Sequence, residues 1–379
     1  MSEVIEINDI EELAQYRLLW NSLLPQTPGA TFFLTLDWLE TYWRHFGHDQ
    51  KLRVLIVQAA GAPIGILSLC VRTEKYRLNK VRVLTYPLDN WSTWFGPIGP
   101  NPSTTMLAAM RHISRTPRDW DMIELRWVGP ESSQINASVR AMRITGQFNE
   151  REEYQITSLV DLPTTWDEFM AGKSHTLRRQ FRRTLRETFD AGGGQFIRHR
   201  PAAATHGDGD PRFDLYDKCE SIAQASWQAT VVNGNTLTHD RVRDYFRDTH
   251  AVAARLGMLD VNLLEIEGRP AAFLYGYHYQ GNVTALRTGY DANLANRGVG
   301  SALILKSLED CIQRGDHCLD FGPGEREHKR RLRTRMEPTY RLTYTPLSSW
   351  RSQTVRLSRW AKHRWHRPPQ APASQPVSA

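Results

Sequence analysis

The feature of this sequence that most constrains its fold is an order of predicted elements that occurs twice. In each half we find two helices, a hairpin of two strands, a further strand, a helix and a last strand. The hairpins are LRVLIVQ and PIGILSLCVR, separated by AAGA, and MLDVNLLEIE and RPAAFLYGYHY, joined at Gly268. A repeated order of this kind indicates an internal duplication. We therefore predict an α/β (α+β) fold of two tandem domains, each a mixed, mainly antiparallel sheet flanked by helices.

The length and composition agree with two globular domains. The chain has 379 residues, of which 40% are hydrophobic and 23% charged. We place the boundary near Leu162, which gives a first domain of residues 1–161 and a second of residues 162–345. Residues 346–379 form a basic tail rich in Trp and Arg, and its Pro/Ala/Ser end is expected to be disordered. In the first domain, TFFLTLDWLETYWRHFG predicts an aromatic helix with Thr35 as its N-cap.

A strand, a glycine turn and a helix follow one another in YDANLANRGVGSAL, from Tyr290 to Leu303. Glycines at the start of a helix leave the backbone amides open to an anion, and the helix dipole favours negative charge there. We therefore expect a diphosphate to bind at Arg297, Gly298, Val299, Gly300 and Ser301. The hairpin and strand that precede this turn favour acyl-CoA over a nucleoside triphosphate, and the sequence contains no P-loop.

Three basic clusters account for the net charge of +7. The first is KSHTLRRQFRRTLRE, from Lys173, a predicted helix at the domain joint with an arginine stripe beside an apolar stripe. That stripe is either a solvated surface or a site for the ribose phosphate of the cofactor or for an anionic acceptor. The second is GEREHKRRLRTR, and the third is the tail, where Trp350, Trp360 and Trp365 alternate with Arg and Lys. Such a tail helix either packs on its own domain or lies on an anionic membrane surface.

Several other classes of protein and site are disfavoured. No apolar run approaches the ~18 residues of a membrane helix, and the acidic N-terminus has no signal-peptide core. We therefore expect a cytoplasmic protein. The four cysteines lack CxxC spacing, which predicts reduced, mostly buried thiols. The histidines show no HxxxH or HExxH spacing, so no metal site is expected, and no Gly-x-Ser-x-Gly motif occurs.

Three stretches resemble the GNAT acyltransferase superfamily, most closely its tandem-domain branch of CelD-like and FemAB-like acetyltransferases. They are TFFLTLDWLETYWRHFG, SHTLRRQFRRTLRE and YDANLANRGVGSALILKSLEDCIQRGDHCLDFGPGEREHKRRL. The last contains the family's strand end with a following Gly, acid and Lys, here Asp320, Phe321, Gly322, Gly324, Glu325 and Lys329. One position departs from the family: its pyrophosphate loop usually starts with Arg or Gln, and this chain has Ala295. Arg297 is a candidate replacement, and a degenerate, non-catalytic domain is the alternative.

The resemblance implies acetyl-CoA or another acyl-CoA as donor, with its pantetheine arm between splayed fourth and fifth strands of a GNAT-like second domain. An amine then attacks the thioester directly, which requires positioning and a base. The candidate bases are Glu265, Asp291, His278 and Asp320, and Tyr290 is the candidate acid for the departing thiolate. Trp227, Glu325 and Lys329 are expected to contact the acceptor. Structural roles are open for several of them: packing for Trp227, Tyr290 and His278, and a turn cap for Asp320.

The implied activity is acyl transfer to a small-molecule or saccharide amine, as an envelope or exopolysaccharide precursor. One alternative is an aminoacyl-tRNA-dependent transferase, in which the basic joint helix binds tRNA. Another is a non-enzymatic scaffold held at the membrane by the tail. In the first domain the corresponding segment WSTWFGPIGP lacks a matching glycine pair. We therefore expect that domain to be structural or to bind the acceptor.

Overall fold

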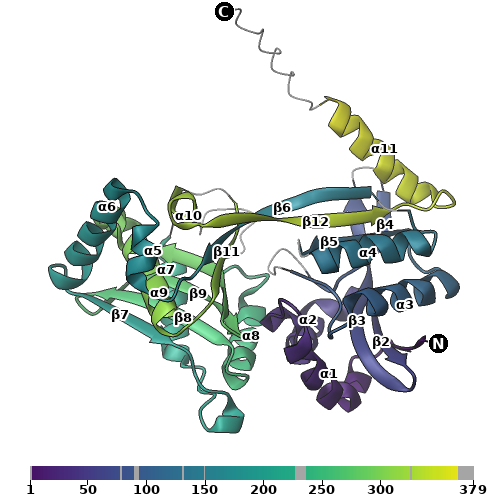
Figure 1. Ribbon diagram of the computed structural model, residues 1–379, viewed down its shortest axis with the longest axis horizontal. Helices are drawn as coiled ribbons and strands as arrows, with labels where there is room; N and C mark the ends of the chain where they lie inside the picture. The colour runs from purple at the N-terminus through teal and green to yellow at the C-terminus, as the bar shows by residue number, and fades with distance from the viewer. Residues whose placement is uncertain are drawn as a thin grey trace, which may run out of the picture.

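The structure is a computed structural model that describes residues 2–76, 79–88, 94–129, 132–148, 150–226, 236–324 and 327–365. The described residues form one mixed sheet of twelve strands, with helices packed on it (Figure 1). Its strand order is β1-β2-β3-β4-β5-β12-β6-β11-β10-β9-β8-β7. Neighbouring strands are antiparallel except for two parallel pairs, β4 with β5 and β10 with β11. The predicted α/β fold with a mixed, mainly antiparallel sheet is confirmed.

The first half of the sheet follows the chain from residue 2 to residue 161. Its strands are β1 (Ser2–Ile7), β2 (Gln50–Ala59), β3 (Ala62–Tyr76), β4 (Asn79–Thr85), β5 (Met122–Val128) and β6 (Glu150–Asp161). Its helices are α1 (Arg17–Leu23), α2 (Leu36–Phe46), α3 (Pro102–Arg115) and α4 (Ser132–Ile144). The predicted cap of α2 is confirmed, because the Thr35 side chain accepts a hydrogen bond from the Trp38 amide.

The second half repeats this order after two additional helices, α5 (Trp166–Ala171) and α6 (His175–Leu185). Its strands are β7 (Gly194–His199), β8 (Leu259–Ile266), β9 (Arg269–Tyr279), β10 (Asn282–Tyr290), β11 (Cys318–Pro323) and β12 (Arg335–Tyr344). Its helices are α7 (Phe213–Ala225), α8 (Arg243–Arg255), α9 (Val299–Gln313) and α10 (Glu327–Leu332), and α11 (Trp350–Trp365) follows β12. Strands β1 to β6 thus correspond to β7 to β12, which confirms the predicted duplication.

Each half gives its last strand to the other. β12 lies between β5 and β6, and β6 lies between β12 and β11. The sequence pattern predicted neither strand, and their exchange joins the two sheets into one. The boundary near Leu162 stays a prediction, and in the structure this residue directly follows β6.

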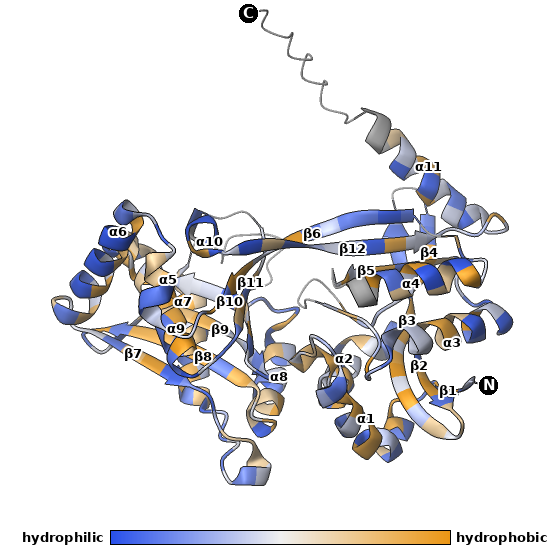
Figure 2. Ribbon diagram, in the orientation of Figure 1, coloured by the Kyte–Doolittle hydropathy of each residue, from blue (hydrophilic) through white to orange (hydrophobic). Residues whose placement is uncertain are grey.

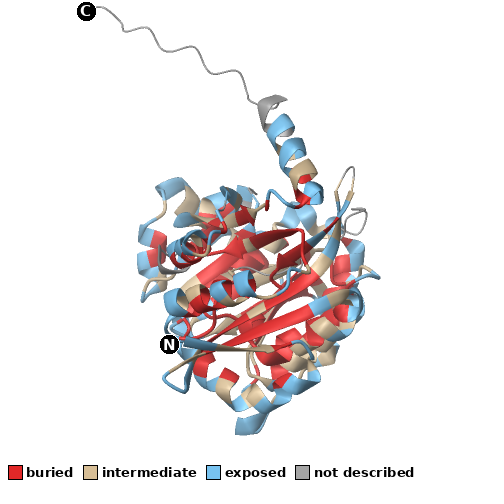
Figure 3. Ribbon diagram, turned by 90° about the vertical axis from the view of Figure 1, so that its right-hand side faces the viewer, coloured by how far each residue is buried: buried red, intermediate tan, exposed pale blue. Residues whose placement is uncertain are grey.

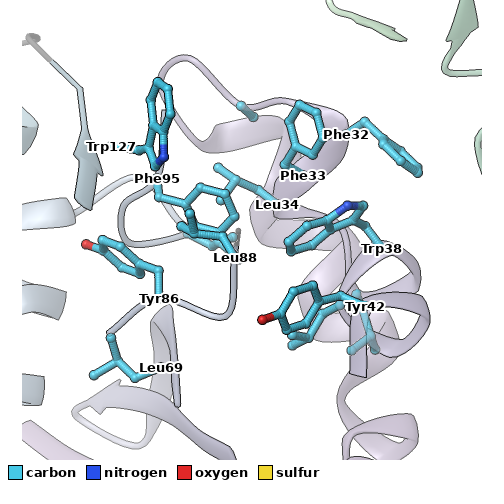
Figure 4. Close-up of a cluster of buried hydrophobic side chains, with 14 of the residues drawn as sticks. Phe32, Phe33, Leu34, Trp38, Tyr42, Leu69, Tyr86, Leu88, Phe95 and Trp127 are labelled. Carbon is cyan, nitrogen blue, oxygen red and sulfur yellow. The ribbon is translucent and has the colours of Figure 1, made fainter. Parts of the chain in front are cut away.

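The core lies between the sheet and its helices, and the strands are largely buried (Figure 3). Hydrophobic residues are concentrated on strands such as β2, β8 and β9, whereas β6 and β12 are mostly hydrophilic (Figure 2). The first half contains a dense aromatic cluster that includes Phe33, Trp38, Tyr42 and Phe95 (Figure 4). The Trp38 indole also donates a 2.7 Å hydrogen bond to the Tyr245 hydroxyl of α8, so the two halves share a core.

All four cysteines are free thiols, and three of them are buried. Burial raises the pKa of Cys70 and of Cys311 to about 12, so neither is present as a nucleophilic thiolate near neutral pH. Within the described ranges, no cluster of His, Cys, Asp and Glu side chains is arranged to hold a metal ion. No described helix has the length and apolar composition needed to cross a bilayer.

Candidate functional site

A wedge opens in the sheet between β10 and β11. The two strands run parallel for three residue pairs, the last of which is Thr284 opposite Asp320. Beyond it, β10 continues beside β9 as far as Tyr290, after a bulge that precedes Arg287. β11 instead continues beside β6. Openings at the carboxyl ends of adjacent parallel strands are common ligand sites in α/β proteins.

The glycine turn lies at the start of α9, immediately after β10. Gly298 has a φ of 65°, in the left-handed region, and no atom lies within 4 Å of the position its Cβ would occupy. At Gly300, a Cβ would lie 3.2 Å from Cδ1 of Tyr290. The first amides of a helix have no partner within it, and the helix dipole adds positive potential there. The turn therefore presents open backbone donors.

A groove of about 600 Å³ begins at this turn. Its apolar walls come from α6, α9 and α10 and include Phe181, Ile304, Leu305 and Leu332. Polar lining residues lie on the same helices and include Gln180, Ser301, Glu327 and Arg331. Four of the five predicted anion-binding residues line the groove: Gly298, Val299, Gly300 and Ser301.

Arg297, the fifth, is not among the lining residues described. Its side chain is exposed, and Nη2 lies 3.5 Å from the carbonyl oxygen of Gly192, in the turn after α6. Ala295 lines the groove in the position where the family usually has Arg or Gln. The arginine that lines the groove is Arg331 of α10, which also forms a 3.0 Å ion pair with Glu327.

The arginine stripe of α6 does not face this groove. Gln180, Phe181 and Thr184 line the groove from one side of the helix. With 3.6 residues per turn, Arg182 and Arg186 lie on the opposite side, and both are exposed. The stripe is therefore presented to solvent rather than to a ligand in the groove.

A second cavity, of about 320 Å³, lies between the two halves at the apex of the wedge. Thr284 of β10 and Asp320 of β11 line it from the second half, and Thr31 and Trp94 line it from the first. Its remaining lining residues are Gly29, Gly129, Leu159, Asn282, Val283, Cys318, Arg335 and Glu337. The cavity therefore exists only because the two halves are joined.

Asp320 is the candidate base that lies at this cavity. It is 5% exposed. Its Oδ1 accepts a 2.6 Å hydrogen bond from the Gly322 amide, and its Oδ2 accepts a 3.0 Å bond from the indole of Trp94. Both donors fix the carboxylate at the point where β10 and β11 separate. The predicted turn-cap role of Asp320 and a role at the cavity are thus compatible.

None of the other three candidate bases is among the lining residues of either cavity described above, and two of them make structural contacts. The carboxylate of Glu265 forms an ion pair with the ammonium group of Lys218 in α7, at a distance of 2.7 Å. Asp291 caps the turn that leads to Gly298, because its Oδ1 accepts a 2.9 Å bond from the Asn293 amide. Burial, with a contribution from nearby Arg200, lowers the pKa of His278 to about 4, which makes it a weak base.

Tyr290 and Lys329 both lie near the wedge, Tyr290 at the groove and Lys329 at the turn after Asp320. Tyr290 lines the groove beneath Gly300. Lys329 is buried, and its ammonium group donates hydrogen bonds of 3.1 and 2.7 Å to the carbonyl oxygens of Gly322 and Pro323. It thereby holds the turn that follows Asp320. Trp227 and Glu325, predicted to contact the acceptor, lie outside the described residues.

Trp94 is the main site residue that the sequence did not indicate. It has a φ of 55° and reaches Asp320 across 226 positions of the chain. The available signal was its location in WSTWFGPIGP, a Pro- and Gly-containing segment directly after a strand. Irregular loops beside a rigid sheet often carry ligand-binding residues.

A comparison with known families identifies the domain in which the groove lies. Residues 175–330 match the model of the acetyltransferase (GNAT) domain. This part of the chain is a GNAT acyltransferase domain. The GNAT domain includes α6, the wedge, the glycine turn and nearly all of the groove. The second cavity, in contrast, takes Trp94, Thr31 and Glu337 from outside the GNAT domain.

Solved structures extend the similarity in fold to 91–94% of the chain. The structure of FemX has a TM-score of 0.61 at 10% identity, with 94% of this chain and 99% of that chain covered. The C-terminal domain of a putative lysylphosphatidylglycerol synthetase from Agrobacterium fabrum gives 0.55 at 12%, covering 93% and 96%. A protein of unknown function from Bacteroides thetaiotaomicron gives 0.54 at 11%, covering 91% and 100%. No curated protein matches this sequence.

Proposed function

We propose that this GNAT acyltransferase binds acyl-CoA in the groove and transfers the acyl group directly to an amine. The observation that carries the proposal is the groove of about 600 Å³ that starts at the open turn of Gly298 and runs beside β10. Backbone amides at the N-terminus of a helix are able to bind a diphosphate. The apolar walls from α6 and α9 are able to pack against a pantetheine arm.

The donor and the acceptor are proposed to approach the wedge from different cavities. The amides of Val299, Gly300 and Ser301 bind the diphosphate, and Arg331 adds a positive charge at the groove. The amine acceptor occupies the second cavity, where Asp320 lies at the apex of the wedge. The thioester and the amine then meet between β10 and β11, which provides the positioning that direct transfer requires.

Asp320 is proposed to accept the proton that the amine loses. As the amine nitrogen bonds to the acyl carbon, the carbon–sulfur bond breaks and the thiolate leaves. Tyr290 lines the donor groove and is the residue proposed to protonate that thiolate. Trp94 and Lys329 are positioning residues, because one holds the carboxylate of Asp320 and the other holds the turn after it.

We propose an amino sugar of an envelope or exopolysaccharide precursor as the acceptor. In support, the second cavity combines the carboxylate of Asp320 with the hydroxyl of Thr284 and the indole of Trp94, while Glu337 is paired with Arg335 at the same cavity. Carboxylates favour an ammonium group, and an indole with hydroxyl neighbours suits a sugar ring. The volume of about 320 Å³ fits a single sugar rather than a long chain.

The test is acyl-CoA binding by calorimetry with wild type, Gly298→Glu and Gly298→Asn. Glutamate places a negative charge where the diphosphate binds, so we expect acetyl-CoA affinity to fall at least ~100-fold, because a charged hydrogen-bonded contact is lost. Asparagine is the matched control, because it tolerates the left-handed conformation without adding charge. Absence of wild-type binding at millimolar acetyl-CoA would refute the proposal, and so would equal affinity of the glutamate variant.

An aminoacyl-tRNA donor is a second candidate, favoured by the exposed arginines of α6 and by the FemX-like fold. On this alternative, tRNA binding should be steeply salt-dependent and should weaken in Arg182→Glu/Arg186→Glu. Acetyl-CoA binding should not change in that variant, since both arginines lie opposite the groove. No tRNA binding at low salt would eliminate this candidate.

A further inference from the structure

One side of α11 fixes this helix to the first half of the molecule. Val355 is buried and packs in a cluster with Val81, Val83 and Met122. The Arg359 guanidinium forms an ion pair with the fully buried carboxylate of Glu124. The start of α11 is therefore attached to the sheet, and from there the helix projects outward (Figure 1).

The opposite side of α11 carries large apolar side chains in solvent. Trp350 is 64% exposed, Leu357 63% and Trp360 58%. Because these residues follow one another at intervals of seven and three, they lie along one side of an α-helix. Packing against the sheet accounts for Val355, whereas Trp350, Leu357 and Trp360 each stay more than half exposed. Two exposed tryptophans aligned with a leucine form a surface that is unusual for a helix in water.

The charge of this segment is entirely positive. Residues 346–379 contain six Arg and Lys residues and neither Asp nor Glu. Arg351 and Arg356 flank the exposed apolar side, and about half of each side chain is accessible, although each also lies near an acid of the first half, Asp121 or Glu150. An apolar stripe with tryptophans and flanking cations is the pattern of a helix that lies in the interface of an anionic bilayer.

We propose that the exposed side of α11 docks on the surface of an anionic phospholipid bilayer. Tryptophan rings favour the headgroup level, and the cations are attracted to acidic lipid headgroups. Charge decides between a bilayer and a second copy of this chain, because two molecules that each carry a net charge of +7 repel one another. The proposal does not depend on acyl transfer, so the two can be tested separately.

The ion pair of Arg359 with Glu124 determines which variant is suitable for the test. Deletion of residues 346–379 would leave Glu124 with one fewer cation partner and would disturb the first half itself. We therefore use Trp350→Ser/Leu357→Ser/Trp360→Ser, which removes the apolar side and keeps every ion pair of α11. The matched control is Leu18→Ser, since Leu18 of α1 is 85% exposed and lies on a different surface.

The measurement is co-sedimentation with vesicles of phosphatidylcholine alone or with about one third phosphatidylglycerol. We expect the wild type and Leu18→Ser to bind the anionic vesicles, with weaker binding at high salt, and to leave the neutral vesicles unbound. The triple variant should partition at least ~10-fold less. Its acetyl-CoA affinity, measured by calorimetry, should equal that of wild type.

Three outcomes would overturn the proposal. In the first, the wild type does not sediment with anionic vesicles. In the second, the triple variant sediments as wild type does, which would assign binding to charge alone. In the third, light scattering shows a wild-type dimer that the triple variant dissociates, with no vesicle binding, and the exposed side would then be a self-association surface.

Discussion

In the second half, β10 and β11 separate after three residue pairs and leave a groove of about 600 Å³. In the first half, β4 and β5 separate after two residue pairs, the second of which is Leu84 with Ile123. There, however, a segment of the chain that includes Phe95 lies beside β5. The Phe95 amide donates a 2.8 Å hydrogen bond to the carbonyl oxygen of Trp127, and Phe95 pairs with Val128. The cavity described beside Phe95 measures only about 10 Å³.

The helices that follow the two openings differ in the same way. α9 directly follows Gly298, around which space is open. α3 begins in close contact with β3: a Cβ on Gly65 would lie 2.1 Å from Oγ1 of Thr105, and a Cβ on Gly99 would lie 2.7 Å from the carbonyl oxygen of Ile64. The same strand and helix framework therefore holds an open groove in one half and a packed core in the other.

Two carboxylates, each the third residue of its strand, also have different surroundings. Thr343 of β12 pairs with Glu124 of β5, and Leu159 of β6 pairs with Asp320 of β11. Glu124 is buried between Arg126 and Arg359. Its burial alone would raise the pKa, but the two arginines outweigh this effect and lower it. Asp320 instead lies at a cavity, which makes one acid structural and the other available for chemistry.

The largest effect is expected from Phe95→Ala, which removes the side chain that fills the first opening. Deleting a buried phenylalanine leaves a cavity, and we expect the free energy of unfolding to fall by about 3–5 kcal/mol in denaturant titration. Phe148→Ala is the control, because Phe148 is 75% exposed. Acyl-CoA affinity should not increase, because α3 remains packed against β3. A second acyl-CoA site in the variant would show that Phe95 alone accounts for the difference between the two halves.

The next effect distinguishes Asp320 from its counterpart. With acetyl-CoA and glucosamine as the amine probe, Asp320→Asn should lower kcat by roughly 10²-fold, a barrier increase of about 2.7 kcal/mol, with little change in the KM for acetyl-CoA. Glu124→Gln should leave kcat unchanged and lower the free energy of unfolding, because it weakens two buried ion pairs. If Asp320→Asn kept the wild-type kcat, the role of Asp320 would be structural only.

A fall in pH should lower the free energy of unfolding of the first half, because Glu74 becomes protonated. Burial alone would raise the pKa of Glu74, but Arg126 and Arg72 lower it from 4.5 to about 2. Because the folded pKa is the lower one, the stabilisation is complete above pH 4.5 and is lost as the pH falls towards 2. We expect a loss of up to about 3 kcal/mol across this window by denaturant titration, and a smaller pH dependence in Glu74→Gln. An identical pH profile in that variant would contradict this assignment.

The smallest effect is expected at the turn of the open half. Asp291→Ala removes the bond to the Asn293 amide and should cost about 1 kcal/mol of stability, as the loss of a capping side chain does. Acetyl-CoA affinity should fall only ~3-fold, as expected for a small loss of order at the turn. A fall in kcat comparable to that of Asp320→Asn would instead make Asp291 a base.

The sequence predicted the duplication, both hairpins and the glycine turn, because each rests on a local hydrophobic pattern or on glycine. It did not predict β6 and β12, whose sequences are rich in charge. Cross-strand ion pairs stabilise them, such as Arg335 with Asp161 and Arg341 with Glu152. The contact of Trp94 with Asp320 joins distant parts of the chain and has no local signal. The pairing of Glu265 with Lys218, likewise, is visible only in three dimensions.

The exchange of β6 and β12 bears on how such a molecule can change over generations. A duplicated gene usually leaves one copy dispensable. Here the first half cannot be discarded, because a fragment that ends at Asp161 would carry β6 without β11 and β12, and the remaining fragment would have β11 and β12 without the strand between them. Selection for acyl transfer in one half therefore also preserves the other, and the two are inherited as a single unit.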